Sequence, residues 1–409
     1  MNTRVVIAGA GHAAGQAVAT LRQKKYPGEI LLVGEEPWLP YQRPPLSKKF
    51  LAGELPTERL YVKPPSFYED PSITVMLGTR VESIDRSARR VGLSDGQSVP
   101  YDALILSVGA RVRRLPPLPG SELAGIHYLR NVEDVQHIRQ DMAEGRNLVI
   151  VGAGYIGLEA AAVASKLGLN VTVVEMLERV MKRVVAPRVS QFYEREHRAH
   201  GVNLMLETGI SGFSGSARVD GVVLKDGNVV PADLVVVGIG IVPNTDLALN
   251  AGLEVADGII VDDHCRTADA YVYAVGDCTM HPNRLLGRNV RLECVQNALE
   301  QARTAAANIC GEDTRYEEIP WFWSDQYDLK LQIAGLSQGY DRALIRDHRG
   351  GHDGKSFSCV YLLGDRILAV DAVNNPRDFL QSKKLIADRA SMDIDRLEDS
   401  RIELKDLAV

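Results

Sequence analysis

Short apolar runs recur along the 409-residue chain and predict the strands of parallel sheets. Several of these runs are continuous rather than alternating, which is typical of strands that are buried on both faces of a sheet. Helical patterns lie between them, for example over residues 13–25 and 156–167. Strands that alternate with helices predict an α/β fold with Rossmann-like, doubly wound domains. The expected strands cover residues 5–8, 30–33, 103–108, 148–151, 171–174, 234–237 and 271–275.

An internal repeat lies within this pattern. Each copy has two glycines with one residue between them, then a glutamate, then an Asp-Gly turn. An aspartate follows six residues after the glycine of the turn, and another glycine follows seven residues later. The repeat predicts two nucleotide-binding domains with the same plan, each carrying a hairpin around its Asp-Gly turn. The matching positions are Gly9, Gly11, Glu35, Asp95, Gly96, Asp102 and Gly109 in one copy, and Gly152, Gly154, Glu175, Asp226, Gly227, Asp233 and Gly240 in the other.

The pattern changes after about Trp321. Apolar segments over residues 357–363 and 367–373 flank a turn at Gly364 and Asp365. Two strands around such a turn predict a hairpin, and hence an antiparallel sheet in a smaller C-terminal α+β domain. The tail beyond Asp388 is charged and only weakly patterned, so no function is assigned to it.

Charge and hydropathy narrow the classes of partner. The chain has 53 acidic and 47 basic residues, and its net charge of −6 argues against a general nucleic-acid-binding protein. No stretch reaches the roughly 18–20 apolar residues that a membrane-spanning helix needs. We therefore expect a soluble cytoplasmic protein with neither a nucleic acid nor a membrane as partner.

The cysteines stand too far apart for a metal or dithiol site. Neighbouring cysteines are separated by 13, 16, 16 and 49 residues, so there is no CxxC pair and no Cys/His cluster. We expect reduced thiols and no bound metal. The five residues are Cys265, Cys278, Cys294, Cys310 and Cys359.

The first glycine pair opens a dinucleotide fingerprint. Gly9, Gly11 and Ala14 follow a predicted strand and begin a helix. Gly9 makes the tight turn, Gly11 lets the backbone approach a pyrophosphate, and the small Ala14 allows the helix to pack closely on the strand. Glu35 ends the next apolar run and can accept hydrogen bonds from ribose hydroxyls. The alternative is a tight strand–helix turn without a ligand.

A second fingerprint follows the predicted strand at residues 148–151. Gly152, Gly154 and Gly157 repeat the spacing, and Glu175 closes the next strand. A carboxylate at that place binds the 2′-hydroxyl of a ribose and repels a 2′-phosphate. The sequence therefore favours NADH over NADPH.

Two fingerprints in one chain indicate two dinucleotides, and the economical pair is a bound FAD and a visiting NADH. Residues 267–277 support FAD, because they predict a strand that ends in Gly276 and Asp277. The Asp277 carboxylate could hold the hydroxyls of a ribitol chain, or it could cap a helix from a turn.

Arg179 and Arg183 follow Glu175 closely and leave the use of NADPH open.

Together these motifs resemble those of the glutathione-reductase-like FAD/NAD(P) flavoproteins over essentially the whole chain. Within that group the sequence looks most like the putidaredoxin-reductase-type ferredoxin reductases, which serve bacterial oxygenases. Residues 320–326 are the most specific motif, because the chain has only three tryptophans and the family has an aromatic ring beside its flavin. The alternative is that these rings are ordinary core. The motifs cover residues 9–15, 43–48, 128–130, 152–159, 240–244, 274–278, 295–301 and 320–326.

The resemblance implies that Lys48 and Glu159 form a catalytic ion pair near the flavin N5. A lysine cation there stabilises the reduced flavin, and Glu159 holds the lysine in place. Without the resemblance, Lys48 would be interpreted as a surface lysine and Glu159 as an acid in the first turn of a helix. Tyr155 either shields the flavin until nicotinamide arrives or serves as packing. The implied cofactor-binding residues are Gly9, Gly11, Ala13, Ala14, Glu35, Arg43, Lys48, Val81, Arg130, Gly152, Gly154, Tyr155, Gly157, Glu175, Gly240, Asp277, Val295 and Trp323.

The order of the motifs supports the discontinuous first domain that the resemblance implies. Asp277 serves the first nucleotide yet follows the second fingerprint in the chain. We expect an FAD-binding domain made of residues 1–110 and 247–320, an NAD-binding domain at 111–246, and a C-terminal domain at 321–409.

The position of the first cysteine, Cys265, points to the electron acceptor. Disulfide reductases of this fold carry a redox dithiol soon after the ribose acid, and relatives that reduce peroxide or coenzyme A disulfide carry one cysteine there. Residues 41–48 hold no cysteine. Electrons must therefore leave the flavin directly, and the resemblance implies a [2Fe–2S] ferredoxin that supplies a cytochrome P450 or another oxygenase.

Such ferredoxins are typically acidic, so docking needs basic residues around the flavin edge. Arg303, Lys330, Lys383 and Lys384 are the candidates, and ordinary solvated charges are the alternative. We expect a monomer or a weak homodimer. Other functions left open are an NADH oxidase or rubredoxin reductase of the same fold, and a non-catalytic flavoprotein that senses NADH by changing its shape or partner.

Overall fold

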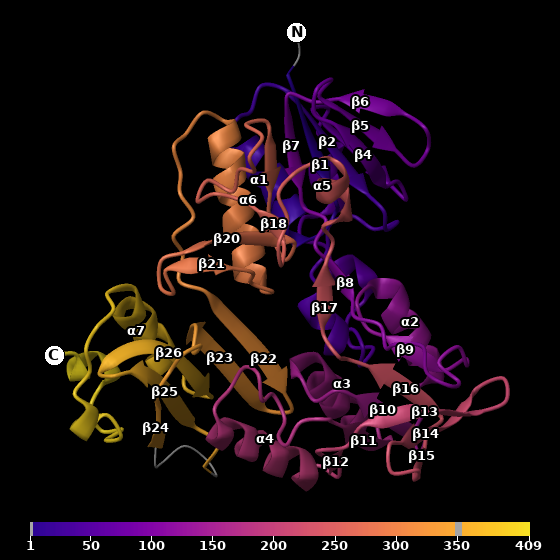
Figure 1. The fold of residues 1–409 in the computed structure, drawn as a ribbon, viewed down its shortest axis with the longest axis vertical. Coiled ribbons are helices and arrows are strands. Elements are labelled where there is room, and N and C mark those ends of the chain that lie inside the picture. Colours follow the sequence, from indigo (N-terminus) through magenta and orange to yellow (C-terminus); the bar gives the residue numbers. More distant parts are fainter. Residues whose placement is uncertain (1–2, 348–353) are drawn as a thin grey trace. The chain divides into compact units, whose positions relative to one another are not determined.

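The computed structural model describes residues 3–347 and 354–409, and its chain folds into two compact units. The first unit consists of Met1–Arg43, Thr57–Arg111 and Val242–Pro320. The second consists of Pro44–Pro56, Val112–Ile241 and Trp321–Val409. Figure 1 follows the chain through both units from indigo to yellow.

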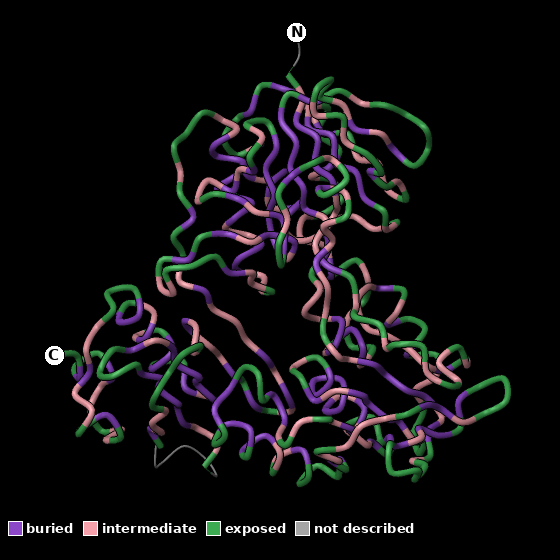
Figure 2. Tube along the Cα trace, viewed as in Figure 1, coloured by how far each residue is buried: buried purple, intermediate pink, exposed green. Residues whose placement is uncertain are grey.

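A five-stranded parallel sheet forms the centre of the first unit. Its order is β19-β7-β1-β2-β3, and α1 packs against α6 beside it (Figure 1). The sheet and helices bury continuous apolar runs, so these strands are largely purple in Figure 2. The elements are β1 (Arg4–Ala8), β2 (Glu29–Gly34), β3 (Ile73–Leu77), β7 (Ala103–Leu106), β19 (Val272–Ala274), α1 (His12–Gln23) and α6 (Val295–Ile309).

Smaller elements complete the first unit. An antiparallel sheet contains the expected Asp-Gly hairpin, in which Gly96 has a φ of +85° between β5 and β6. A second small sheet has the order β18-β20-β21. The bounds are β4 (Val81–Asp85), β5 (Arg90–Leu93), β6 (Ser98–Pro100), β18 (Ile259–Ile260), β20 (Thr279–Asn283), β21 (Arg288–Val290) and α5 (Asp246–Asn250), with short 3-10 turns at Thr57–Arg59 and Pro65–Glu69.

The second unit contains another five-stranded parallel sheet, of order β12-β11-β10-β16-β9. It also contains a small antiparallel sheet, β13-β14-β15, with the second Asp-Gly hairpin between β14 and β15. The bounds are β9 (Ile126–Tyr128), β10 (Asn147–Val151), β11 (Asn170–Val174), β12 (Asn203–Met205), β13 (Ile210–Gly215), β14 (Val219–Leu224), β15 (Val229–Pro231), β16 (Leu234–Val237), α2 (Val132–Asp141), α3 (Tyr155–Lys166) and α4 (Pro187–Ala199).

The internal repeat of the sequence corresponds to this pair of parallel sheets. Asp102 accepts a hydrogen bond from the backbone N–H of Arg4, the first residue of β1, at 2.7 Å. Asp233 accepts the equivalent bond from Asn147, the first residue of β10, at 2.8 Å. The matched aspartates therefore each fix the start of a central strand, which explains their equal spacing from the hairpin.

The C-terminal part of the second unit is an antiparallel sheet of order β22-β23-β26-β25-β24, against which α7 packs. The expected hairpin joins β25 and β26, with Gly364 at a φ of +64°. This confirms the predicted α/β fold with a C-terminal antiparallel sheet. The bounds are β22 (Trp321–Gln326), β23 (Leu329–Gly335), β24 (Arg342–Asp347), β25 (Phe357–Leu363), β26 (Arg366–Val373) and α7 (Pro376–Ala387), with 3-10 turns at Ile394–Arg396 and Leu404–Leu407.

The C-terminal tail, which has no clear sequence pattern, is held by a buried arginine. Arg346 is fully buried and donates hydrogen bonds to the carbonyl oxygens of Leu397 and Ile402. It also pairs with Asp378 of α7 at 3.2 Å. The tail is therefore a structural part of the C-terminal sheet domain.

The chain passes between the units at β8 (Ala110–Val112) and β17 (Ile241–Pro243), which pair with each other. Pro44–Pro56 groups with the second unit, although we assigned it to the FAD-binding domain. The three-part division by ligand stays a prediction, because the contacts group the NAD-binding and C-terminal segments together. Among the described residues, no helix has both the length and the apolarity to cross a bilayer.

Candidate cofactor site

Gly9 and Gly11 form the turn between β1 and α1. Gly9 has a φ of +107°, and a Cβ atom on it would lie 2.4 Å from the carbonyl oxygen of Ser107. Gly11 is the N-cap residue of α1, and a Cβ atom there would meet nothing within 4 Å. Gly9 is therefore required by the fold, whereas the space at Gly11 is open to a ligand.

The second fingerprint has the same construction between β10 and α3. Gly152 has a φ of +106°, and its Cβ would lie 2.5 Å from the carbonyl oxygen of Gly238. A Cβ on Gly157 would lie 2.2 Å from the carbonyl oxygen of Gly152, so this glycine permits close contact of helix and turn. The N-cap residue Gly154 again faces open space.

The N-termini of three helices suit the polar parts of dinucleotides. The N-cap residues of α1, α3 and α6 are Gly11, Gly154 and Cys294, which give no side-chain cap, and no acidic residue lies in the first turn of these helices. Helix α4 shares these features, but Pro187 at its first position removes one N–H group. By contrast, Asn131 and Asn375 cap α2 and α7 with their side chains. Uncapped N–H groups with the positive end of the helix dipole bind phosphate and carbonyl oxygens. These helix ends therefore fit the cofactors that the fingerprints predict.

The two glutamates of the repeat are not equivalent. The Gly9 N–H bonds to the carbonyl of Val33, and the Gly152 N–H bonds to that of Val174. This register aligns Gly34, rather than Glu35, with Glu175. The alignment of Glu35 with Glu175 in the sequence repeat is thus wrong by one residue. A Cβ on Gly34 would lie 2.5 Å from the Cβ of Ala10, so residue 34 cannot carry an acidic side chain, and the acid of the first copy follows it at Glu35.

The surroundings of the two acids also differ. Glu175 accepts hydrogen bonds from the backbone N–H groups of Ala153 and Leu177 at 2.8 and 2.9 Å. A carboxylate has about four acceptor positions, so capacity remains for ribose hydroxyls. The Glu35 side chain is 69% exposed and pairs with Arg80 at 3.2 Å.

Arg43 lies in an acidic environment within the first unit. Its guanidinium bonds to Glu36 at 2.6 Å and to the hydroxyl of Tyr41 at 3.0 Å. Burial works to lower the pKa of Arg43, but Tyr41, Glu36 and Asp277 outweigh it and raise that pKa. Arg43 and Asp277, which are far apart in sequence, are therefore close enough to interact.

The remaining first-unit candidates lie at strand ends and helix starts. Asp277 follows β19 after Gly276, which has a φ of +84°. Gly276 donates its N–H to the Gln301 side chain on α6 at 2.7 Å, which fixes the loop. Ala13 and Ala14 are buried in the first turn of α1, Val81 begins β4, and Val295 begins α6.

Lys48 and Glu159 form the expected ion pair within the second unit. The Lys48 Nζ lies 2.8 Å from a carboxylate oxygen of Glu159, and their side chains are 16% and 1% exposed. The hydroxyls of Ser47 and Ser324 donate to the two carboxylate oxygens at 2.5 and 2.6 Å. The structure confirms the pair, whereas its place beside a flavin stays a prediction.

The position of Glu159 corrects the simpler interpretation of this residue. Helix α3 begins at Tyr155 and has no acid in its first turn, so Glu159 is not a first-turn acid. Burial raises the pKa of Glu159, while the charge of Lys48 and the bonds from Lys48, Ser324 and Ser47 act to lower it. A carboxylate held in this way has a partner at each of its oxygens, despite its burial.

Ser47 and Ser324 are site residues that sequence reasoning missed. Both lie inside motifs that carried the resemblance, at residues 43–48 and 320–326. Ser47 is adjacent to Lys48, and Ser324 lies on the face of β22 that packs against α3. Because side chains alternate along a strand, the sequence could have placed Ser324 on the same face as Phe322.

The aromatic residues lie on both faces of β22. The rings of Tyr155 and Phe322 are 4.8 Å apart, and the Tyr155 hydroxyl is buried without a hydrogen-bond partner. Trp323 lies on the other face of the strand, with its ring 5.5 Å from that of Trp321. Tyr155 therefore packs at the start of α3, beside the open position of Gly154.

Two further candidates lie in loops of the second unit. Arg130 precedes α2, and its backbone N–H bonds to Asp134 at 2.8 Å. Gly240 follows β16 with a φ of +104°, and its carbonyl accepts the N–H of Arg113. Neither observation tests a contact with a cofactor.

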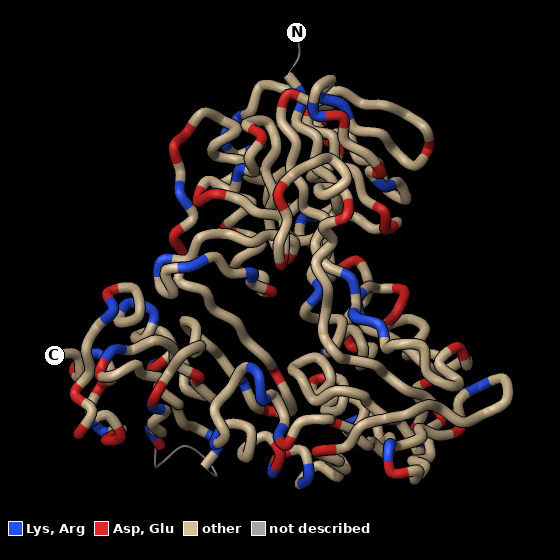
Figure 3. The backbone as a smooth tube through the Cα atoms, in the orientation of Figure 1, with Lys and Arg blue, Asp and Glu red and all other residues tan. Residues whose placement is uncertain are grey.

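The four docking candidates belong to both units. Arg303 is exposed on α6 of the first unit, where it pairs with Glu300. Lys330 is exposed on β23, and Lys383 and Lys384 lie on α7. The Lys383 ammonium is 4.5 Å from the centre of the Trp321 ring. Acidic and basic residues are interspersed over α7 and the tail that follows it (Figure 3).

All five cysteines are free thiols. Burial raises the pKa of Cys278 and of Cys294 to about 12, and that of Cys265 also lies well above its usual value. Thiols of such high pKa stay protonated near neutral pH and are poor nucleophiles. These three buried thiols are therefore poorly suited to disulfide chemistry.

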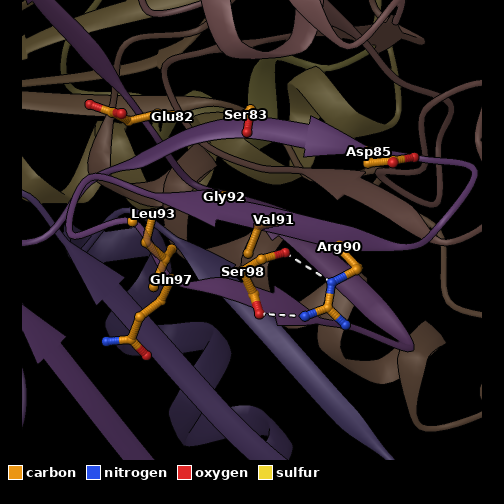
Figure 4. Close-up of a pocket in the computed structure, with 10 residues that line it drawn as sticks. Glu82, Ser83, Asp85, Arg90, Val91, Gly92, Leu93, Gln97 and Ser98 are labelled. Carbon is orange, nitrogen blue, oxygen red and sulfur yellow. Dashed lines mark hydrogen bonds between the residues drawn. The ribbon is translucent and has the colours of Figure 1, made fainter.

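A cavity of about 290 Å³ lies on the small sheet β4-β5-β6 and contains none of the candidate residues. Figure 4 shows its polar lining, in which Arg90 bonds to Ser98 within the sheet itself. The cavity is a feature of this sheet and does not belong to either fingerprint.

Comparison with known proteins agrees with this geometry. Residues 3–305 match the model of the pyridine nucleotide-disulphide oxidoreductase family. The chain belongs to this family. Residues 321–408 match the reductase C-terminal model, which corresponds to the antiparallel sheet domain. Members of the family use FAD and a pyridine nucleotide, in agreement with the two predicted cofactors.

The similarity extends over whole chains. Putidaredoxin reductase of Pseudomonas putida is 44% identical over 99% of this chain and 97% of its own. A rubredoxin-NAD(+) reductase of the same species is 39% identical over 91% of this chain and 96% of its own. The crystal structure of a covalent putidaredoxin reductase–putidaredoxin complex matches with a TM-score of 0.95 and 44% identity, covering 99% of this chain and 98% of that one.

Proposed function

We propose that the chain is a cytoplasmic NADH-dependent ferredoxin reductase. It takes an electron pair from NADH and delivers single electrons to a [2Fe–2S] ferredoxin, which supplies a cytochrome P450 or another oxygenase. The observation that carries this proposal is the full-length similarity to putidaredoxin reductase, including the C-terminal domain. The lack of any cysteine before Cys265 supports a direct transfer to an external acceptor.

The first unit provides the FAD site in this proposal. The N-terminus of α1, with Gly9, Gly11, Ala13 and Ala14, binds the pyrophosphate. Further residues are assigned to the rest of FAD, that is, to its ribose, its ribitol chain and its ring. These residues are Glu35, Arg43, Val81, Asp277 and Val295, which all belong to the first unit.

The second unit provides the NADH site. The open space at Gly154 and the uncapped N-terminus of α3 receive the pyrophosphate of NADH, and Gly152 and Gly157 shape the turn. Glu175 binds the adenosine ribose and repels a 2′-phosphate. Gly240 and Tyr155 are assigned to the nicotinamide side of the site.

Lys48 and Glu159 are assigned to the reacting end. A bound FAD would supply the chemistry of accepting a hydride from NADH and releasing electrons singly. Lys48 would supply the positive charge that favours a reduced flavin, and Glu159 orients that lysine through a 2.8 Å ion pair. Tyr155 and the apolar residues near it limit the access of water.

A comparison of acceptors tests the proposed function. The FAD-loaded protein is reduced with one equivalent of NADH under anaerobic conditions and mixed rapidly with a [2Fe–2S] ferredoxin, a rubredoxin or dissolved oxygen. We expect the ferredoxin to oxidise the flavin at least about tenfold faster than the other acceptors, because complementary docking raises its rate of association.

Each competing function gives a different result in the same experiment. Faster transfer to rubredoxin would make the chain a rubredoxin reductase, a function that the 39% identical relative favours as second candidate. Rapid reaction with oxygen would indicate an NADH oxidase. No transfer to any acceptor, with a long-lived complex of reduced flavin and NAD⁺, would indicate a sensor of NADH.

A further inference from the structure

A chain of side-chain hydrogen bonds leads from Glu159 through the second unit. The Ser324 Oγ lies 2.6 Å from Glu159 Oε1, and the Gln326 Nε2 lies 3.2 Å from Ser324 Oγ. The Gln326 Oε1 lies 2.8 Å from His197 Nε2, and the Tyr327 hydroxyl lies 3.0 Å from His197 Nδ1. We call Ser324, Gln326, His197 and Tyr327 the donor chain.

The Glu159 carboxylate at the end of the donor chain determines which group donates in each hydrogen bond. An ionised Glu159 can only accept, so Ser324 must donate its single proton to it. Ser324 then accepts from the amide Nε2–H of Gln326, which leaves the Gln326 oxygen facing His197. His197 must donate its Nε2–H to that oxygen, and its Nδ1 accepts the hydroxyl proton of Tyr327. All four donors therefore point toward Glu159.

The donor chain is buried almost to its end. Ser324, Gln326 and His197 are at most 1% exposed, whereas Tyr327 is half-buried and stacks on the exposed His200. Burial lowers the pKa of His197 to about 4, so this residue is neutral at physiological pH. A neutral ring with one donor and one acceptor is the form that the direction of the chain requires.

Two elements hold the donor chain. Phe322, Ser324 and Gln326 share one face of β22, and that strand packs against α3, which carries Glu159. His197 lies in the last turn of α4, and Tyr327 lies in the turn after β22. The strand thus connects the ion pair to a second helix.

The other ionisable groups near Glu159 do not replace these donors. Lys48 is the cation that acts on it, and Ser47 and Ser324 are the neutral donors. Burial raises the pKa of Tyr155 and of Tyr193, and the charges of Asp371 and Glu159 raise both further. Burial is what raises the pKa of Glu159, so donors are needed to keep its carboxylate ionised.

We propose that Gln326 and His197 are positioning residues for the Lys48–Glu159 pair. By fixing the Ser324 hydroxyl as a donor, they keep the Glu159 carboxylate ionised and so hold Lys48 in place. This inference rests on the proposed function, in which Lys48 stands beside the flavin. It adds that residues of α4 and of the C-terminal sheet, which do not contact Lys48, help to fix the position of its charge.

The protonation of Glu159 tests the inference directly. We would titrate the infrared band of the protonated Glu159 carboxyl in the oxidised, FAD-loaded protein and assign it by its loss in Glu159→Gln. In Ser324→Ala the pKa of Glu159 should rise by about one pH unit, and in Gln326→Leu by about half a unit. The double variant should match Ser324→Ala, because Gln326 acts through Ser324.

The pH profile of flavin reduction by NADH gives a second readout. Its acid limb should move upward with the pKa of Glu159 in each variant, while Gln191→Ala, which changes an exposed residue of α4 outside the donor chain, keeps the original profile. An unchanged Glu159 pKa in Gln326→Leu would overturn the inference. So would a double variant whose shift is the sum of the single shifts.

The outcome does not depend on the ferredoxin. If Ser324→Ala fails to fold, the infrared titration of Gln326→Leu decides the matter alone. If the pKa shifts occur but no electrons reach a ferredoxin, then the proposed function fails and the control of Glu159 stands.

Discussion

Glu159 is an acid enclosed where water cannot solvate it. Taking two charges out of water costs several kcal/mol per ion, so a buried pair such as Lys48–Glu159 is poor evidence of a gain in stability. Each oxygen of Glu159 nevertheless has a hydroxyl donor, and Lys48 completes the site. The presence of this buried pair is better explained by a need for charge at this position.

Glu175 makes a prediction at the scale of one residue. Glu175→Ser removes the carboxylate that favours a ribose 2′-hydroxyl and repels a 2′-phosphate. We expect kcat/KM for NADH to fall about tenfold and the NADPH-to-NADH ratio of kcat/KM to rise at least about tenfold. Steady-state reduction of a small dye measures both.

The matched control for this change is Glu178→Gln. Glu178 is an exposed acid three residues away that pairs with Lys182, and its loss removes the same charge without touching the ribose position. The nucleotide preference should stay as in the parent protein. An equal loss for both nucleotides in Glu175→Ser would contradict the assignment of this residue.

At the scale of strands and helices, much of the fold could be predicted, because each element has a pattern that is local in the sequence. The apolar runs predicted the central strands, and the repeat predicted two parallel sheets with their Asp-Gly hairpins. The one-residue offset at Gly34 could not be predicted, because it depends on contact with Ala10 across the turn. Local patterns determine elements, whereas such contacts determine their register.

The candidate site was predictable in the same uneven way. The fingerprints, Lys48 and Glu159 have fixed spacings that a sequence displays. His197 has none, because a single histidine on a helix carries no sign that it meets Gln326, 129 positions later in the chain. The placement of Pro44–Pro56 in the second unit likewise depends on long-range packing.

The turn before α3 allows a paired prediction at the scale of an element. Gly157→Ala forces a Cβ to within 2.2 Å of the Gly152 carbonyl oxygen, so we expect a loss of about 1–3 kcal/mol in stability together with weaker NADH binding. Gly154→Ala meets no protein atom within 4 Å. It should raise KM for NADH with almost no change in stability.

Denaturant unfolding and NADH titration of the two variants measure these effects. The ordinary φ of −78° at Gly154 means that alanine fits the backbone there, so Gly154→Ala separates space for a ligand from space for the fold. Equal stability losses in both variants, or normal NADH binding in Gly154→Ala, would contradict the assignment.

At the scale of the whole molecule, a net charge of −6 must be reconciled with an acidic partner. Local charge can steer association even when the total has the wrong sign. We propose that Arg303 and Lys384 contribute to docking of the ferredoxin. Arg303→Glu and Lys384→Glu should each slow the reduction of a ferredoxin about tenfold at low salt, with little change in NADH-driven reduction of a small dye.

Lys225→Glu is the control for these reversals, because it changes an exposed charge in the turn between β14 and β15. Its ferredoxin rate should stay close to that of the parent protein. A parallel loss in the ferredoxin and dye assays of Arg303→Glu would show that the change affects the NADH reaction rather than docking.

The electron count tests the central claim most directly. NADH is added in known amounts, without oxygen, to the FAD-loaded protein and an excess of oxidised [2Fe–2S] ferredoxin, and the reduced ferredoxin is measured by its absorbance. The account predicts two ferredoxins reduced for each NADH consumed, because one hydride carries two electrons. No reduced ferredoxin under these anaerobic conditions, with NADH consumed only after oxygen is admitted, would contradict it.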